Sequence, residues 1–207
     1  MQKRQFTLVE LLVVIVIMML LVAIAVPVYS RIMNGSAVGH AARMVSSQLN
    51  LARTEACARR KYVAVVFTDE TMSYSTAANT PVIARRAFRS CYLKDEDQTF
   101  DEWVPGTKWE VLPAGAFLTI ANGSSNVGSF ADDAGYITSF TAKKVVTFAP
   151  TGKPIGTSSR PKITVTEGVV SANDKSTDGE IVKKKTDNKI SCYVNLYTGA
   201  ITTKQAE

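Results

Sequence analysis

An uninterrupted apolar stretch near the N-terminus constrains this chain more than any other sequence feature. Every residue from Leu11 to Val26 is apolar, whereas the rest reads as an ordinary water-soluble sequence. Between Phe6 and Val28 the one charged residue is Glu10. A helix of this length, at 1.5 Å per residue, measures roughly 34 Å and can cross a hydrocarbon core of about 30 Å. The stretch therefore predicts a membrane-spanning helix at one end of the chain.

The residues that flank the stretch predict its orientation. Lys3 and Arg4 precede it, so the positive-inside rule keeps the first residues in the cytoplasm and places the remainder outside. An uncleaved signal anchor and a secretory signal peptide, cut after the site Ala23-Ile24-Ala25, are the alternatives. The length of the apolar stretch, Pro27 close behind that cut and a carboxylate at Glu10 argue against ordinary secretion.

Composition narrows the class of protein only moderately. With 207 residues, 46% hydrophobic and 20% charged, the chain is neither disordered as a whole nor collagenous. Its length suits one domain of about 150 residues with a substantial appendage. The net charge of +6 permits an anionic partner without requiring one.

Beyond the membrane segment the apolar pattern becomes periodic and predicts an amphipathic helix over residues 29–60. Polar residues, including Arg43 and Arg53, fall between the apolar positions and can face water or another subunit. Pro27 and the pair Gly35 and Gly39 are places where the helix can bend. The apolar positions, spaced three or four apart, are Val38, Ala41, Val45, Leu49, Ala52 and Ala56.

The remainder, residues 61–207, predicts a mainly antiparallel β head. Short segments rich in β-branched and aromatic residues alternate with clusters of Gly, Pro, Asn and Ser. The turn at 197–199 predicts a hairpin between the last two strands. The expected strands are Tyr62–Thr68, Val145–Phe148, Lys162–Thr166, Ile190–Leu196 and Ala200–Thr203.

The N-terminal motif points to a known family. The segment Phe6-Thr7-Leu8-Val9-Glu10-Leu11-Leu12-Val13-Val14-Ile15, with basic residues before it and Pro27 and Tyr29 after it, closely resembles the N-terminus of type IV pilins and pseudopilins. The resemblance implies a leader of residues 1–5 and a transmembrane and assembly helix over residues 6–28, Pro27 included. A prepilin peptidase would cut between Gln5 and Phe6 and methylate the new Phe6 amine. Glu10 would pair with the N-terminal amine of a neighbouring subunit, the cationic partner that a carboxylate in a membrane helix calls for.

One position departs from the family pattern. The family nearly always has glycine before the cut, where a slim backbone suits the peptidase, and this chain has Gln5. Gln5 would slow or block processing, and an unprocessed protein would be only a membrane anchor. The match downstream of Gln5 favours processing.

Two further stretches narrow the family. Residues 47–56 with the strand after them, and residues 145–152 with a late strand ending in Tyr197-Thr198-Gly199, resemble the H-type minor pseudopilins and the FimT-like minor pilins. This resemblance implies an α+β fold in which a long N-terminal helix packs on a mainly antiparallel head of two sheets. Residues 78–139 match no stretch of that family.

The resemblance also implies a function. The chain would be a minor subunit that assembles into the pseudopilus of a type II secretion system or into a type IV pilus, and it would not be an enzyme. Its partners would be the prepilin peptidase, other pilins or pseudopilins and the inner-membrane assembly platform. It would be a single-pass bacterial inner-membrane protein with a periplasmic head. The alternatives are a DNA-binding minor pilin for natural transformation and a plain membrane-anchored binding domain.

The side chains that carry chemistry form no catalytic or metal-binding pattern. His40 has no cysteine or second histidine at ligand spacing, so neither a metal nor a cofactor is expected. Cys57, Cys91 and Cys192 lie in the part expected outside the cytoplasm, where disulfides persist. A Cys91–Cys192 bond is the preferred pairing and three free thiols are the alternative.

Charged clusters are the remaining candidates. The acidic residues at 95–102 lack the spacing of a calcium loop and predict a solvated loop. Lys183 to Lys185, diluted by acidic neighbours, predict a solvated hairpin tip. Some FimT-like relatives bind DNA through arginines near the C-terminus, but residues 201–204 contain none. DNA contact would therefore rest on the basic group Arg85, Arg86 and Arg89.

Overall fold

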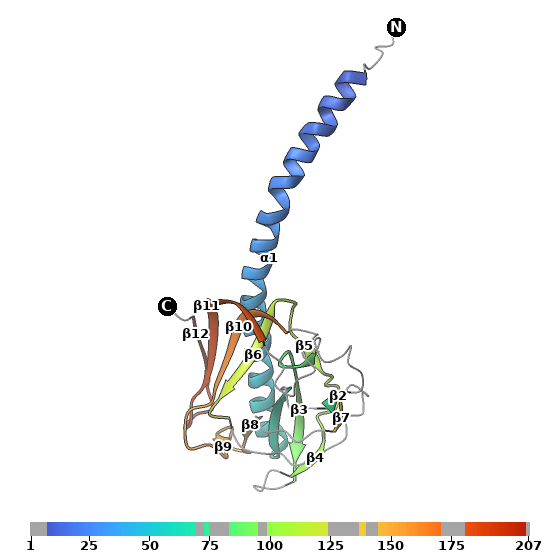
Figure 1. Cartoon of the computed structure of the whole chain (residues 1–207). Coiled ribbons are helices and arrows are strands. Elements are labelled where there is room, and N and C mark those ends of the chain that lie inside the picture. The colour runs from blue at the N-terminus through green and yellow to red at the C-terminus, as the bar shows by residue number, and fades with distance from the viewer. Residues whose placement is uncertain are drawn as a thin grey trace, which may run out of the picture.

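The structure is a computed structural model that describes residues 8–68, 73–74, 83–94, 99–123, 137–139, 145–170 and 181–205. Side-chain environments are described for these residues except 25–35, 73–74, 137–139, 169–170 and 181–187. One long helix leads into a β-rich head, and the N-terminal half of the helix projects away from that head (Figure 1).

Helix α1, Leu8–Arg59, is continuous over 52 residues, or about 80 Å. It runs through Pro27 without a break and curves gently between the projecting half and the head (Figure 1). The two helical segments expected from the sequence are therefore one rod. The first turn contains Glu10 and the last contains Arg59, an arrangement that complements the helix dipole at both ends.

The first sheet contains six strands in the order β4-β3-β1-β8-β9, with β5 also pairing with β3. All of its pairings are antiparallel. Its central strand β1 follows directly on the helix and is dense in valine, as a strand buried on both faces should be. Its strands are β1 (Tyr62–Phe67), β3 (Ala87–Leu93), β4 (Phe100–Trp103), β5 (Glu110–Val111), β8 (Val145–Phe148) and β9 (Pro154–Ile155).

The second sheet contains four antiparallel strands in the order β12-β11-β10-β6. Its strands are β6 (Ala116–Ala121), β10 (Lys162–Val170), β11 (Ile181–Val194) and β12 (Ile201–Gln205). A separate two-stranded pair joins β2 (Ser73–Tyr74) to β7 (Ile137–Ser139). The α+β architecture expected from the sequence, a long helix on two antiparallel sheets, is confirmed.

The main core lies where the C-terminal half of α1 packs against both sheets. All six apolar positions of the predicted stripe, from Val38 to Ala56, are buried in it. They meet Phe67 and Phe148 of the first sheet and Val165 of the second. Gln48, also on α1, donates a 2.8 Å hydrogen bond from Nε2 to Ser90 Oγ, so this buried amide group has a partner. Both sheets thus hold the same stretch of helix.

A second, smaller cluster lies on the face of the first sheet that points away from α1. It contains Cys91 and is flanked by the partly buried rings of Tyr62, Phe100, Trp103 and Trp109. The centroids of the Trp103 and Trp109 rings lie 5.5 Å apart in an edge-to-face arrangement. Side chains of β3 therefore alternate between the main core, which Phe88 and Tyr92 enter, and this second cluster, which Cys91 and Leu93 enter.

A strand lies at each of the five positions where one was expected, and two segments expected to be loops are strands instead. Lys183 to Lys185 do not form a hairpin tip, because β11 begins at Ile181 and pairs Gly168 with Lys183 and Glu167 with Lys185. Asp101 and Glu102 lie in the short strand β4 and not in a loop, while residues 95–98 lie outside the described residues. Strands β3 to β7 lie within residues 78–139, the stretch that matched no part of the family.

Candidate functional site

The most unusual surface of the molecule is the projecting half of α1. Every described side chain from Leu8 to Ile24 is exposed, with Leu8 at 80% and Ile15 at 44% of full accessibility. On the head half of the same helix, Val38, Val45 and Leu49 are completely buried. A contiguous apolar surface of this extent is rare on a monomeric soluble protein and marks an interaction surface.

Glu10 is the single charged residue on this described apolar segment. It lies in the first turn of α1 and is exposed, where the partial positive charge of the helix N-terminus favours a carboxylate. Gln5 and Phe6 lie outside the described residues, as does the side chain of Pro27. Within the described part of the chain, no helix has the length and hydropathy required of a membrane span.

The preferred disulfide between Cys91 and Cys192 is not formed. Both cysteines are buried free thiols, and Cys57 is an exposed one. Cys91, on β3, points away from α1 into the outer cluster. Cys192, on β11 in the other sheet, faces α1, and its Sγ lies 3.7 Å from the carbonyl oxygen of Ala42. The two thiols thus belong to different faces of different sheets, and the alternative of three free thiols is the one observed.

Two arginines of the predicted basic group make contacts inside the head. Arg89 is buried on β3, with its guanidinium carbon 4.2 Å from the centroid of the Trp103 ring. Arg86 is half-buried, and its Nη2 donates a 2.8 Å hydrogen bond to the carbonyl of Leu112. Burial lowers the pKa of Arg86 from its ordinary value. These arginines support the head and offer little charge to a phosphate backbone.

Arg85 completes the basic group in a different way. It adopts a left-handed conformation with φ of 52° in the turn before β3. Its carbonyl accepts a 2.8 Å hydrogen bond from the amide of Leu118, which links this turn to the second sheet. The backbone of Arg85 thus helps to join the turn before β3 to the second sheet.

The two described residues of the predicted acidic cluster, Asp101 and Glu102, form ion pairs with Lys61. Lys61 Nζ lies 3.8 Å from Asp101 and 3.7 Å from Glu102, and all three side chains are substantially exposed. Such surface pairs contribute little stability. Among the described residues, no group of three or more His, Cys, Asp or Glu side chains is arranged to hold a metal ion.

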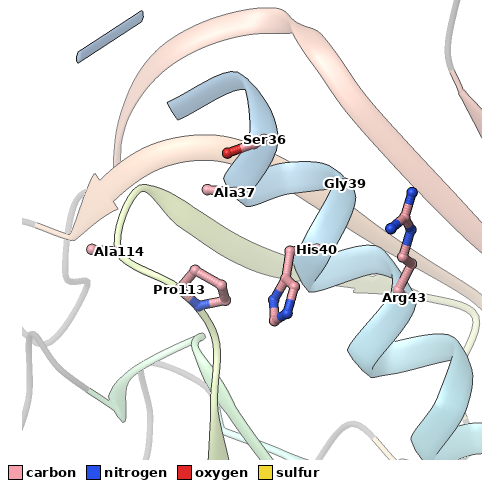
Figure 2. Close-up of a pocket in the computed structure, with 7 residues that line it drawn as sticks. All are labelled: Ser36, Ala37, Gly39, His40, Arg43, Pro113 and Ala114. Atoms are coloured by element: carbon pink, nitrogen blue, oxygen red, sulfur yellow. The ribbon is translucent and has the colours of Figure 1, made fainter. Parts of the chain in front are cut away.

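His40 lies in a pocket where α1 leaves the head (Figure 2). The pocket has a volume of about 650 Å³. The imidazole points toward Pro113, whereas the side chain of Arg43 turns to the other side of the helix (Figure 2). The lining residues, Ser36, Ala37, Gly39, His40, Arg43, Pro113 and Ala114, hold no acid–base pair or activated nucleophile that would make this an active site.

A junction of two turns with the helix was not recognised in the sequence. Gly152, after β8, and Gly199, before β12, both have positive φ and lie against each other and against Arg53 of α1. The Nε of Arg53 is buried there and makes no hydrogen bond within the described structure. The signal that could have revealed this junction is the repeated Thr-Gly pair at residues 151–152 and 198–199.

Comparison with known proteins gives similarities of fold. No protein-family model and no curated protein matches the sequence. The type IV minor pilin FimU of Pseudomonas aeruginosa is 11% identical over 81% of this chain and 87% of its own, with a TM-score of 0.47. The minor pseudopilin EpsH from the type II secretion system of Vibrio cholerae is 13% identical over 83% of this chain and 96% of its own, also with a TM-score of 0.47. A second EpsH structure is 12% identical, with a TM-score of 0.46.

Proposed function

We propose that this protein is a minor pilin or pseudopilin that assembles through the apolar half of α1 into a pilus or into the pseudopilus of a secretion system. In this proposal the protein has a structural role and no catalytic one. The head remains outside the cytoplasm, and the helix serves first as a membrane anchor and then as an assembly element.

One observation carries the proposal: α1 is a single rod with two different surfaces. Its second half is buried between two sheets, and its first half exposes apolar side chains along its whole described length. A head with its own core does not need that first half for folding. Lipid or the helices of other subunits would supply the missing apolar surroundings, because both bury the same side chains.

Glu10 supports the assembly step more than the anchoring step. A carboxylate within an apolar helix weakens membrane insertion, so it calls for a compensating interaction. The N-terminal sequence motif suggests that this interaction is with the amine of Phe6 in a neighbouring subunit. Cleavage after Gln5 would create that amine, and therefore assembly requires processing in this proposal.

Replacement of Glu10 tests the pairing directly. Glu10→Ala should leave the chain in the membrane fraction but reduce its incorporation into filaments at least tenfold, measured by immunoblotting of sheared or cross-linked filaments. Glu10→Gln should behave in the same way because it removes the charge and keeps the shape. Glu10→Asp is the matched control and should retain more incorporation than either. Normal incorporation of Glu10→Ala would contradict the pairing role.

A further inference from the structure

Strand β12 forms an edge of the second sheet. In the described structure it pairs with β11 alone, and it is the outermost strand of this sheet, close to the C-terminus (Figure 1). Residues 202–205 are exposed. An edge strand presents a row of backbone donors and acceptors that another extended chain can use.

The outward-pointing backbone groups of β12 follow from its register. The amide of Asn195 donates a 2.9 Å hydrogen bond to the carbonyl of Ala200 at the start of the hairpin. Hydrogen-bonded pairs alternate along antiparallel strands, so Thr202 and Lys204 direct their backbone groups toward β11. Ile201, Thr203 and Gln205 then direct their N–H and C=O groups away from the sheet.

A groove runs beside this edge, between the second sheet and the helix. Its volume is about 330 Å³. Thr203 of β12 lines it, so the side chains on one face of an added strand would enter it. The small residues on the helix side leave room for them. The groove is lined by Gly39, Ala42, Arg43, Ser46, Ser47, Ile190 and Thr203.

Positive charge lies on both faces of the edge. Arg43 lines the groove, and Lys204 lies on the opposite face of the sheet. On that opposite face, Arg160 donates a 3.1 Å hydrogen bond from Nη2 to Thr202 Oγ1, and its guanidinium carbon lies 5.1 Å from the centroid of the Tyr193 ring. Lys162 Nζ lies 5.6 Å from the same centroid. Arg43 and Lys204 thus flank the free edge, and Arg160 and Lys162 add positive charge farther in on the sheet face that carries Lys204.

The paired segments of the second sheet nearest to this edge carry no acidic residue. Residues 162–166, 189–193 and 201–205, which pair with one another in the described sheet, contain no Asp or Glu. The next acidic residue on β10, Glu167, is buried and accepts a 2.8 Å hydrogen bond from Asn188 Nδ2. Within these three described segments, no carboxylate therefore accompanies the positive charge at this edge.

We propose that β12 accepts an extended acidic segment of a partner protein as an additional antiparallel or parallel strand. Main-chain hydrogen bonds to Ile201, Thr203 and Gln205 would hold the segment, and its alternate side chains would enter the groove. Carboxylates on the face that carries Lys204 make favourable contacts across the new pairing, while the alternate side chains enter the groove that Arg43 lines. A lysine on an edge also repels a second copy of the same edge, which leaves an acidic partner as the preferred occupant.

The test uses the full-length protein in a zwitterionic detergent. The probes are a synthetic peptide of alternating glutamate and valine and a matched peptide with lysine in place of glutamate. The glutamate peptide should bind at least tenfold more tightly by fluorescence anisotropy. It should also slow amide hydrogen exchange in residues 201–205. Absence of binding, or equal affinity for the two peptides, would overturn the proposal.

Two variants separate strand addition from general charge attraction. Thr203→Pro removes an outward-pointing N–H and should weaken binding at least tenfold, whereas the matched control Thr203→Ala should bind like the wild type. Lys204→Glu should weaken binding of the glutamate peptide at least tenfold and keep the melting temperature unchanged. If Thr203→Pro does not fold, the affinity of Lys204→Glu for the glutamate peptide tests the proposal. Wild-type affinity in either folded variant would contradict the proposal, whatever the outcome of the filament experiments.

Discussion

Gly199 packs directly against the backbone of Gly152, and a Cβ atom added to Gly199 would overlap the carbonyl oxygen of Gly152. The same Cβ position lies 3.1 Å from Nε of Arg53. This contact brings together the turn after β8, the turn before β12 and helix α1. It therefore links the first sheet, the second sheet and the helix at one point.

Replacement of Gly199 by alanine should destabilise the head strongly. The residue has φ of +68°, which disfavours any side chain, and the new methyl group would meet backbone that cannot move aside easily. We expect a loss of roughly 3 kcal/mol in the free energy of unfolding, the sum of left-handed strain and overpacking. Urea unfolding, monitored by tryptophan fluorescence, measures this loss in the free energy of unfolding.

Gly106 provides the matched control for this substitution. It has φ of +80°, but nothing lies within 4 Å of an added Cβ. Gly106→Ala should therefore cost only the backbone strain, about 1 kcal/mol. Equal losses in the two variants would show that the contact between Gly199 and Gly152 adds nothing.

Gly39→Ala should stabilise the head, in contrast to the two glycine replacements above. Gly39 lies inside helix α1, and an added Cβ meets no atom within 4 Å. Alanine removes the backbone entropy that glycine loses in a helix, worth about 0.5–1 kcal/mol. The melting temperature of the head should rise by about 2 °C. An unchanged or lower melting temperature would mean that the pocket beside Gly39 does not tolerate a methyl group.

The three cysteines should differ sharply in reactivity. Burial raises the pKa of Cys91 to about 12 and that of Cys192 to about 11, so both remain protonated thiols at pH 8. Iodoacetamide should modify the exposed Cys57 first, and the other two only after unfolding in denaturant. Peptide mass spectrometry gives the rate at each site. Comparable rates in the folded protein, or a peptide containing a Cys91–Cys192 bond, would contradict this arrangement.

Tyr92 should make the stability of the head sensitive to alkaline pH. Burial, together with a 2.5 Å hydrogen bond from its Oη to Glu55 Oε1, raises the pKa of Tyr92 to about 12. The folded state holds this proton more tightly than the unfolded chain, whose tyrosine pKa is about 10. Stability should therefore be intact below pH 10 and fall as the pH rises toward 12.

Tyr92→Phe isolates this contribution. The variant should lose about 1–2 kcal/mol at neutral pH, because a buried hydrogen bond to a carboxylate is removed. Its unfolding free energy should then vary less with pH between 10 and 12 than that of the wild type. Parallel pH profiles for the two proteins would rule out Tyr92 as the titrating group.

The helix and the simplest strands could be predicted from sequence because each follows a local pattern. The apolar spacing from Val38 to Ala56 predicts the buried face of α1, and the valine-rich residues 62–67 predict β1. Both patterns depend only on periodicity and side-chain type. Strand β11 was predicted too short, because Lys183 to Lys185 look like solvated loop residues unless the pairing with β10 is known.

Long-range contacts account for what the sequence did not reveal. Cys91 and Cys192 both lie in strands, but only the arrangement of the sheets shows that they face different environments. The sequence suggested that the arginines at 85–89 could contact DNA. In the structure, Arg89 stacks on the Trp103 ring, and Arg86 donates a hydrogen bond to the carbonyl of Leu112. The groove beside β12 likewise exists only because α1 crosses that end of the second sheet.

The N-terminus of the protein recovered from membranes is the measurement that tests the proposed assembly role most directly. Mass spectrometry should find a mature chain that begins with N-methylated Phe6 and retains the whole of the apolar helix. A chain that begins at Met1 would be an unprocessed anchor, and one that begins at Val26 would be a secreted protein without the helix. Either of these results would contradict the proposal that α1 is an assembly element.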